Sequence, residues 1–143
     1  MAGVLTYDPK RVMVIFGTHQ IHGMSEDDIV TVSPLGDGMQ IHVGADGEVA
    51  RSIDPNHCYE VTLSLATTSK SNDYLSNMFN LDGNTGGGIA PLLIKDLAGS
   101  TLFYAAQAWV QNAPEMGKHR TVDTQEWTLN TGYVENPIFG GNN

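Results

Sequence analysis

The side chains best suited to chemistry are the two histidines of the string HQIH, His19 and His22, and the adjacent pair His57 and Cys58. Imidazole and thiolate groups bind zinc, and a thiol beside a base can act as a nucleophile. The surrounding residues favour extended backbone, in which the two members of each pair point to opposite faces. We therefore expect surface or turn histidines and a packed cysteine, with no catalytic residue and no metal site.

The stretch GDGMQIHVGADGEV, residues 36–49, contains two Asp-Gly pairs and raises the question of a calcium loop. An EF-hand loop requires oxygen ligands at its first, third and fifth positions and glycine at the sixth. Counted from Asp37, those later positions hold Met39, Ile41 and His42, and only the final Glu48 fits. The spacing therefore excludes an EF-hand.

Two other stretches could bind a cofactor or act in catalysis. GNTGGGIAP, residues 83–91, is rich in glycine, but it lacks the Lys-Ser/Thr ending of a phosphate loop and the spacing of a dinucleotide fingerprint. The acidic run of Glu26, Asp27 and Asp28 is typical of a solvated turn, because acid catalysis needs partners that the sequence does not place. The sequence thus predicts no cofactor.

Length and charge limit the function classes. The 143 residues predict one domain, 1–143, and no apolar run approaches the roughly 18 residues of a membrane span, so we expect a soluble protein without membrane insertion. Sixteen acidic and seven basic residues give a net charge of -9, which opposes binding to nucleic acid through phosphate neutralisation. One cysteine cannot form an internal disulfide, so stability must come from packing or assembly.

The elements that position these residues are mostly strands. Apolar, β-branched or alternating stretches predict strands at 11–16, 28–35, 58–66, 101–111 and 123–133, with a turn at Gly17-Thr18. Helical spacing occurs at 71–82, where Ser71 is the expected N-cap, Asp73 suits the first turn and Gly83 ends the helix. The sequence therefore predicts a mainly β fold, a β-sandwich or barrel with one packed α-helix.

Residues 36–53 predict a hairpin with Asp46-Gly47 as a two-residue turn. That register distributes apolar residues over both faces. One face would carry Ile41, Val43, Ala45, Glu48, Ala50 and Ser52, and the other Gln40, His42, Gly44, Val49, Arg51 and Ile53. Two half-apolar faces are hard to explain in a monomer, and they favour a segment that neighbouring subunits cover over the alternative of an irregular surface loop.

The strings HVGADGEVARS (42–52) and TTSKSNDYLSNM (67–78) resemble the small tail tube proteins of contractile-tailed phages. The opening VMVIFGTHQIHGM and the strand DDIVTVSPLGDG occur in the expected order, and the C-terminal half matches mainly by strand order. The resemblance implies a β-sandwich with one helix, similar to the tube protein of type VI secretion. It also implies hexameric rings stacked into a hollow tube, without enzyme activity or cofactor.

The resemblance further implies partners and a location. The chain would bind copies of itself, a sheath protein, a baseplate or tube initiator and a tail terminator. DNA would pass through the lumen without specific binding, in a virion tail assembled in the host cytoplasm. The segment at about 36–57 would be the assembly loop that reaches another subunit, through Ile41, Val43, Gly44, Ala45, Asp46, Gly47, Glu48 and Val49.

Two predicted strands have polar faces that could line such a lumen, where carboxylates repel phosphates. The candidates are Glu60, Thr62 and Ser64 in one strand, and Thr124, Glu126 and Thr128 in the other, and the alternative for either face is an ordinary side turned to solvent or to a sheath. Two alternatives stay open. The chain could build the tube of a phage-like bacteriocin or secretion system, or it could be a small β-sandwich ligand-binding module or hydrolase that uses His19, His22, His57 or Cys58.

Overall fold

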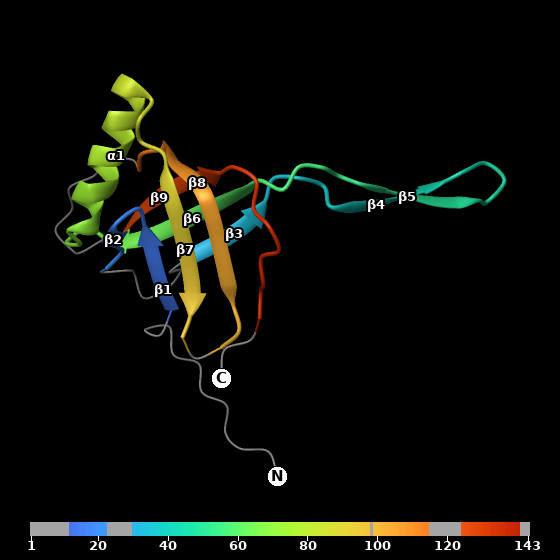
Figure 1. Ribbon diagram of the computed structural model, residues 1–143, viewed down its shortest axis with the longest axis horizontal. Coiled ribbons are helices and arrows are strands. Elements are labelled where there is room, and N and C mark those ends of the chain that lie inside the picture. Colours follow the sequence, from blue (N-terminus) through green and yellow to red (C-terminus); the bar gives the residue numbers. More distant parts are fainter. Residues whose placement is uncertain (1–11, 23–29, 98, 115–123, 141–143) are drawn as a thin grey trace, which may run out of the picture.

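Antiparallel strands dominate the computed structural model, which describes residues 12–22, 30–97, 99–114 and 124–140 (Figure 1). Seven strands form one sheet in the order β2-β1-β7-β8-β9-β6-β3, and β4 and β5 form a separate hairpin. The elements are β1 (Val12–Phe16), β2 (His19–Gln20), β3 (Val30–Pro34), β4 (Met39–Val43), β5 (Val49–Ile53), β6 (Tyr59–Ala66), α1 (Ser71–Thr85), β7 (Ala90–Asp96), β8 (Leu102–Asn112) and β9 (Thr124–Thr131). The predicted mainly β fold with one helix is confirmed.

The core lies against one face of the sheet, because alternate side chains of each strand point to it. In β6 and β9, Leu63 lies opposite Trp127 and Val61 opposite Leu129, and all four are buried. In the other half of the sheet, β1 and β7 contribute the buried pairs Val14–Ile94 and Phe16–Leu92 to the same cluster, which also includes Leu75 of α1. Both halves of the sheet and the helix thus share one core.

Strand β7 was not predicted, although it lies between β1 and β8 in the sheet. Its apolar run, Leu92 to Ile94, was hidden by the glycine-rich stretch before it and by Pro91. Pro91 fits because the β7–β8 register shifts between Ala90 and Leu92, and because its carbonyl accepts a 2.7 Å bond from the amide of Gly17. The glycine-rich stretch 83–91 is therefore a connection only in its middle, since its ends belong to α1 and β7.

Gly17 connects β1 to β2 in a conformation that requires glycine. Its φ is +64°, and a Cβ there would lie 2.6 Å from the hydroxyl oxygen of Tyr74. Tyr74 in turn packs edge-on against Phe16, with 6.2 Å between ring centroids. The predicted turn at Gly17-Thr18 is confirmed, and it lets the helix approach the strand end closely.

The helix starts at residue 71 as predicted, but the predicted N-cap and C-terminal end were wrong. The N-cap is Lys70, with no side-chain cap bond, and Ser71 is instead buried with its Oγ accepting from the amide of His22 at 2.9 Å. Gly83 lies inside the helix, which ends at Thr85. Gly86 (φ +71°) is the C-cap, and its amide donates to the carbonyl of Asp82. A glycine in a helix costs only about 1 kcal/mol, so the helix continues through it. The expected acidic first turn, with Asp73, is confirmed.

One predicted segment, the acidic run of Glu26, Asp27 and Asp28, lies outside the described residues. Among the described residues, no helix has the length and apolar character to cross a membrane.

A buried hydrogen bond joins α1 to the sheet. The indole Nε1 of Trp127 donates to Oδ1 of Asn72 at 2.9 Å, and the Nδ2 of Asn72 donates to the carbonyls of Ala66 and Ser69. Replacement of Asn72 by Ala leaves the indole N–H and these carbonyls without this partner. We expect Asn72→Ala to lower the free energy of unfolding by about 1–3 kcal/mol.

Urea unfolding followed by the fluorescence of Trp127 and Trp109 measures this loss. The matched control is Asn77→Ala, which truncates the same side chain at an exposed position of the same helix. Equal stabilities of the two variants would show that the Asn72 bond does not hold the helix to the sheet.

Candidate functional site

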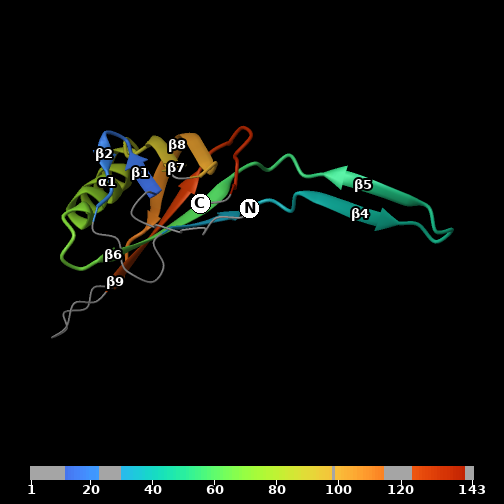
Figure 2. The ribbon, with the colours of Figure 1, turned by 90° about the horizontal axis from the view of Figure 1, so that it is seen from below.

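The hairpin of β4 and β5 projects away from the sheet and packs against no other element in either view (Figures 1 and 2). All residues of both strands are exposed. A two-stranded hairpin on its own is marginally stable in water, because it buries too little apolar surface. A projecting hairpin of this kind is therefore a candidate interaction surface.

The turn of this hairpin has three residues rather than the predicted two. Val43 pairs with Val49, and the amide of Gly44 donates to the carbonyl of Glu48 at 2.8 Å. Ala45, Asp46 and Gly47 form the turn, with Gly47 at φ +85° and Oδ1 of Asp46 accepting from the amide of Glu48 at 3.1 Å. A three-residue loop with a left-handed glycine is a common alternative to the two-residue Asp-Gly turn.

The additional turn residue changes which side chains share a face, because a shift of one residue moves every side chain of a strand to the other side. The prediction of apolar residues on both faces was therefore wrong. One face, here the apolar hairpin face, carries Met39, Ile41, Val43, Val49, Arg51 and Ile53, and the other carries Gln40, His42, Ala50 and Ser52. The five apolar side chains are between 59% and 68% exposed.

The opposite face has its own polar contact. The Nε2 of His42 lies 2.9 Å from Oγ of Ser52, on the strand beside it. This exposed contact links the two strands through polar side chains that water also solvates well. The two faces of the hairpin thus differ in chemistry, and the apolar one is the better binding surface.

Asp54 fixes the base of the hairpin. Its carboxylate accepts from the amide of Asp37 at 2.7 Å and from that of Asn56 at 2.9 Å, while its own amide donates to the carbonyl of Gly38. The Asp37 amide, followed by the Asn56 amide, lowers the pKa of Asp54 below its ordinary value of 3.8. The projection is therefore hydrogen-bonded where it leaves the sheet.

The six residues predicted to line a lumen lie on one face of the sheet, here the polar sheet face. Thr62 is directly opposite Thr128, and Ser64 is opposite Glu126. Strand β3 extends this face, since Thr31 and Ser33 are opposite Thr62 and Glu60. Glu126 and Thr124 are exposed, Glu60, Thr62 and Thr128 are half-buried, and Ser64 is buried.

The expectation that His19 and His22 point apart was wrong, because the strand ends at Gln20. Their rings lie edge-on with 6.4 Å between centroids, and His19 also stacks on Tyr74 at 4.5 Å. Ser71 lies 2.9 Å from Nε2 of His19, so the ring belongs to the contact between β2 and α1. In the described ranges, no group of three or more His, Cys, Asp or Glu residues could hold a metal ion.

His57 and Cys58 have structural contacts. The ring of His57 packs on Tyr133 with 4.8 Å between centroids, and its carbonyl accepts from the amide of Val134 at 3.0 Å. The amide of the half-buried Cys58 donates to Oδ1 of Asn56 at 3.0 Å. These contacts join the hairpin base to the segment that follows β9.

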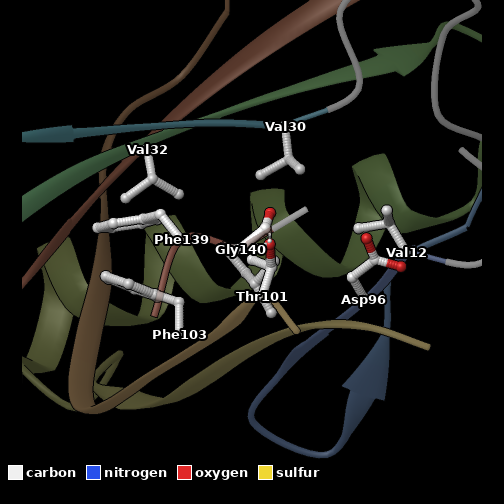
Figure 3. Close-up of a pocket in the computed structure, with 9 residues that line it drawn as sticks. Val12, Val30, Val32, Asp96, Thr101, Phe103, Phe139 and Gly140 are labelled. Atoms are coloured by element: carbon white, nitrogen blue, oxygen red, sulfur yellow. Dashed lines mark hydrogen bonds between the residues drawn. The ribbon is translucent and has the colours of Figure 1, made fainter. Parts of the chain in front are cut away.

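A pocket of about 360 Å³ lies between β1 and β3 (Figure 3). Its walls are mainly apolar, and Phe139 closes one side by stacking on Phe103. Thr101 holds that segment, donating to the carbonyl of Gly140 at 2.8 Å and accepting from its amide at 3.1 Å. The lining residues are Val12, Val30, Val32, Ile94, Asp96, Thr101, Phe103, Phe139 and Gly140. This composition offers packing rather than a set of reacting groups.

Comparison with known proteins gives matches over nearly the whole chain. A family model described as Bacteriophage PhiTE tail tube protein matches residues 14–139. The "Structural protein ORF10" of Pseudomonas phage KPP10 is 33% identical over 153 residues, covering 99% of this chain and 87% of that protein.

Solved structures share the fold at low sequence identity. A chain of the PVC extracellular contractile injection system, sheath-tube complex in extended state, has a TM-score of 0.61 at 16% identity, with 93% of each chain covered. A chain of the native gene transfer agent virion also has a TM-score of 0.61, at 8% identity over 92% of this chain and 100% of that one. The anti-feeding prophage cap has a TM-score of 0.57 at 13% identity, covering 100% and 95%.

The pKa of Asp54 tests the geometry of the hairpin base. A carboxylate that accepts two amide bonds when folded has a lower pKa than in the unfolded chain, so its stabilising effect is present above the unfolded value and is lost as pH falls through the folded value. We expect an NMR titration to place Asp54 below 3.8, with the Asp37 and Asn56 amide shifts following the same curve. An Asp54 pKa at or above 3.8 would contradict this base geometry.

Proposed function

The chain belongs to the phage tail tube protein family and is a structural subunit of a tail tube, and we propose that its copies form hexameric rings stacked into a channel for genome delivery. The observation that carries the proposal is the apolar hairpin face. Five large apolar side chains are exposed together on an element that packs on nothing else in the described chain. Neighbouring subunits are the natural cover for such a surface.

Burial of this face supplies a driving force for assembly. Each Val, Ile or Met side chain contributes about 1.5–3 kcal/mol when it moves from water into an apolar contact.

The assembly-loop residues predicted from the sequence divide between two parts of the hairpin. Ile41, Val43 and Val49 belong to the apolar hairpin face, and Gly44, Ala45, Asp46, Gly47 and Glu48 form its tip.

The edges of the seven-stranded sheet support ring closure. The sheet ends in β3 on one side and in the two-residue β2 on the other, and unpaired strand edges bind other strands. In a ring, each subunit presents one edge to the next, which is the head-to-tail contact that produces closed cyclic assemblies. Closure thereby removes edges that would otherwise aggregate.

The polar sheet face is the proposed lining of the channel. Its hydroxyls and the carboxylates of Glu60 and Glu126 present hydrogen-bonding groups and negative charge, and no lysine or arginine occurs in β3, β6 or β9. A negative lining repels phosphates, so DNA passes without binding. The buried Ser64 would contribute less to the lining than its exposed neighbours.

The proposed partners other than further copies of the chain are the proteins that surround, start and end a contractile tail tube. We infer that the tube is surrounded by a sheath protein, starts on a baseplate or initiator protein and ends at a terminator, in a virion tail assembled in the host cytoplasm. Structures with the same fold come from a sheath-tube complex and from a sheath/tube terminator of an extracellular contractile injection system. These two assemblies are contractile, which supports a contractile machine here too.

The likeness to an extracellular contractile injection system favours a second candidate, the tube of a phage-like bacteriocin or secretion system. The subunit would assemble identically in both machines. Isolation of the assembled particle separates them, because a genome-delivery tube belongs to a particle with DNA and an injection device does not.

Negative-stain electron microscopy of the purified protein over a concentration series tests the assembly proposal. Rings or hollow tubes support it, with or without a preformed initiator complex as seed. A monomer that stays featureless at all concentrations, even on seeds, contradicts it.

Two neighbouring substitutions test the apolar hairpin face. Ile41→Glu adds a carboxylate to that face, and Gln40→Glu adds the same charge to the opposite face one residue away; both positions are exposed. We expect Ile41→Glu to abolish tubes, or to raise the protein concentration they require by at least about tenfold, since each 1.4 kcal/mol of lost contact is a factor of ten. Gln40→Glu should assemble like the wild type. Equal assembly of both variants would contradict the role of this face.

The channel lining is tested by Glu126→Lys, which reverses an exposed charge on the polar sheet face. We expect tubes to form normally and DNA release to slow on the order of tenfold at low salt, with recovery as salt screens the charge. Asn80→Lys, which adds a lysine to an exposed helix position, is the control. Unchanged release and infection efficiency for Glu126→Lys would show that this face does not line the channel.

A further inference from the structure

We propose that the apolar hairpin face docks on the segment after β9 of a second copy, residues 133–138, and that Arg51 pairs there with Glu135. This inference rests on the proposed function, because it presumes that the hairpin joins subunits. It adds the acceptor surface and the ion pair that sets the register of the contact.

The surface on which the apolar hairpin face docks must carry a carboxylate, because Arg51 lies on that face. It is the single lysine or arginine between residues 36 and 57, and it lies on the apolar hairpin face directly opposite Ile41. Val49 and Ile53, two residues away on the same strand, flank it on that face. Docking of this face removes water from the guanidinium, and a buried cation without an anion is strongly unfavourable. The acceptor therefore needs both apolar side chains and an acidic group.

Most exposed carboxylates of the described residues do not meet both conditions. Asp46 and Glu48 belong to the hairpin tip, and Asp37 belongs to its base. Asp73 is in the first turn of α1, and Glu126 is on the polar sheet face among threonines. The exposed apolar side chains next to Asp37 and Glu48 belong to the hairpin and to the chain that leads into it, so they cannot form a separate acceptor surface. Asp73 and Glu126 have no exposed large apolar side chain within three residues in the described chain.

Glu135 meets both conditions. It is exposed, and Tyr133 and Ile138 near it in the chain are 61% and 50% exposed. Leu102, which pairs with Ile138 and is 41% exposed, extends the apolar area onto β8. This acceptor segment therefore offers one carboxylate between apolar groups, the complement of one guanidinium between apolar groups.

The acceptor segment is held in place at both ends. Val134 is buried, and its amide donates to the carbonyl of His57 at 3.0 Å. Leu102 and Ile138 exchange two backbone bonds of 2.8 Å each. A fixed backbone on both sides of Glu135 lowers the entropy lost on binding, as in other preorganised interfaces.

The fold prevents this contact from forming within one chain. The bond from Val134 to His57 places the acceptor segment at the base of its own hairpin, and the hairpin extends away from that base in both views (Figures 1 and 2). Arg51 therefore meets the Glu135 of another copy. A hairpin that binds a different surface of its neighbour is a head-to-tail contact, which suits rings and stacks.

Charge reversal at both positions tests the pair. Arg51→Glu and Glu135→Arg are each expected to raise the concentration required for tubes at least tenfold, and the double variant should return to within about threefold of the wild type. The control is Arg51→Glu combined with Asp37→Arg. The second change, at the hairpin base, restores the net charge of the subunit but should not rescue assembly. Tryptophan fluorescence and urea unfolding establish that each variant is folded.

The outcomes separate this inference from the proposed function. Wild-type protein that forms no rings or tubes, even on seeds, overturns both. Wild-type tubes together with failure of Glu135→Arg to rescue Arg51→Glu overturn the ion pair alone, as does rescue by Asp37→Arg. If a reversal variant does not fold, a cycle of Arg51→Ala, Glu135→Ala and their double variant replaces it, and additive effects on assembly contradict the pair.

Discussion

Pairing of β6 with β9 in a single antiparallel register is the constraint on which the rest of the sheet depends. Because side chains alternate along a strand, the register that brings Leu63 against Trp127 in the core also brings Thr62 against Thr128 on the opposite side. The indole of Trp127 then donates the hydrogen bond to Asn72 that joins the helix to the sheet. One set of backbone bonds thus determines the core, the helix contact and the polar sheet face together.

The hairpin differs from the sheet, because its shape is set by its turn and its base rather than by a core. Gly47 and the Asp46 side chain set the pairing of β4 with β5, and Asp54 holds the point where both strands leave the sheet. These bonds are local and exposed, so they define a shape without burying the apolar side chains that it displays. The stable environment of those side chains must come from another molecule.

The sequence was sufficient where one local signal dominated. Alternation at 58–66 and 123–133 predicted β6, β9 and their shared polar residues, and two strings predicted the family. It failed where two local signals competed. Asp46-Gly47 fits a two-residue and a three-residue turn equally well, and only the pairing of Val43 with Val49 decides between them. Similarly, Gly83 and Pro91 are residue types that often end helices and strands, yet α1 includes Gly83 and β7 includes Pro91, at a register shift. The relative orientation of the His19 and His22 side chains depended on where β2 ends, and the residue types at 19–22 do not specify that end.

The bond from Val134 to His57 also fixes where two surfaces lie on one subunit. It joins the root of the hairpin to residues 133–138, so the apolar hairpin face and the acceptor segment start from the same point of the fold. In the proposed assembly, a copy bound through its hairpin would present its acceptor segment to the next copy at a fixed offset. Repetition of one fixed offset is what turns a pairwise head-to-tail contact into a closed ring or a stack of constant pitch.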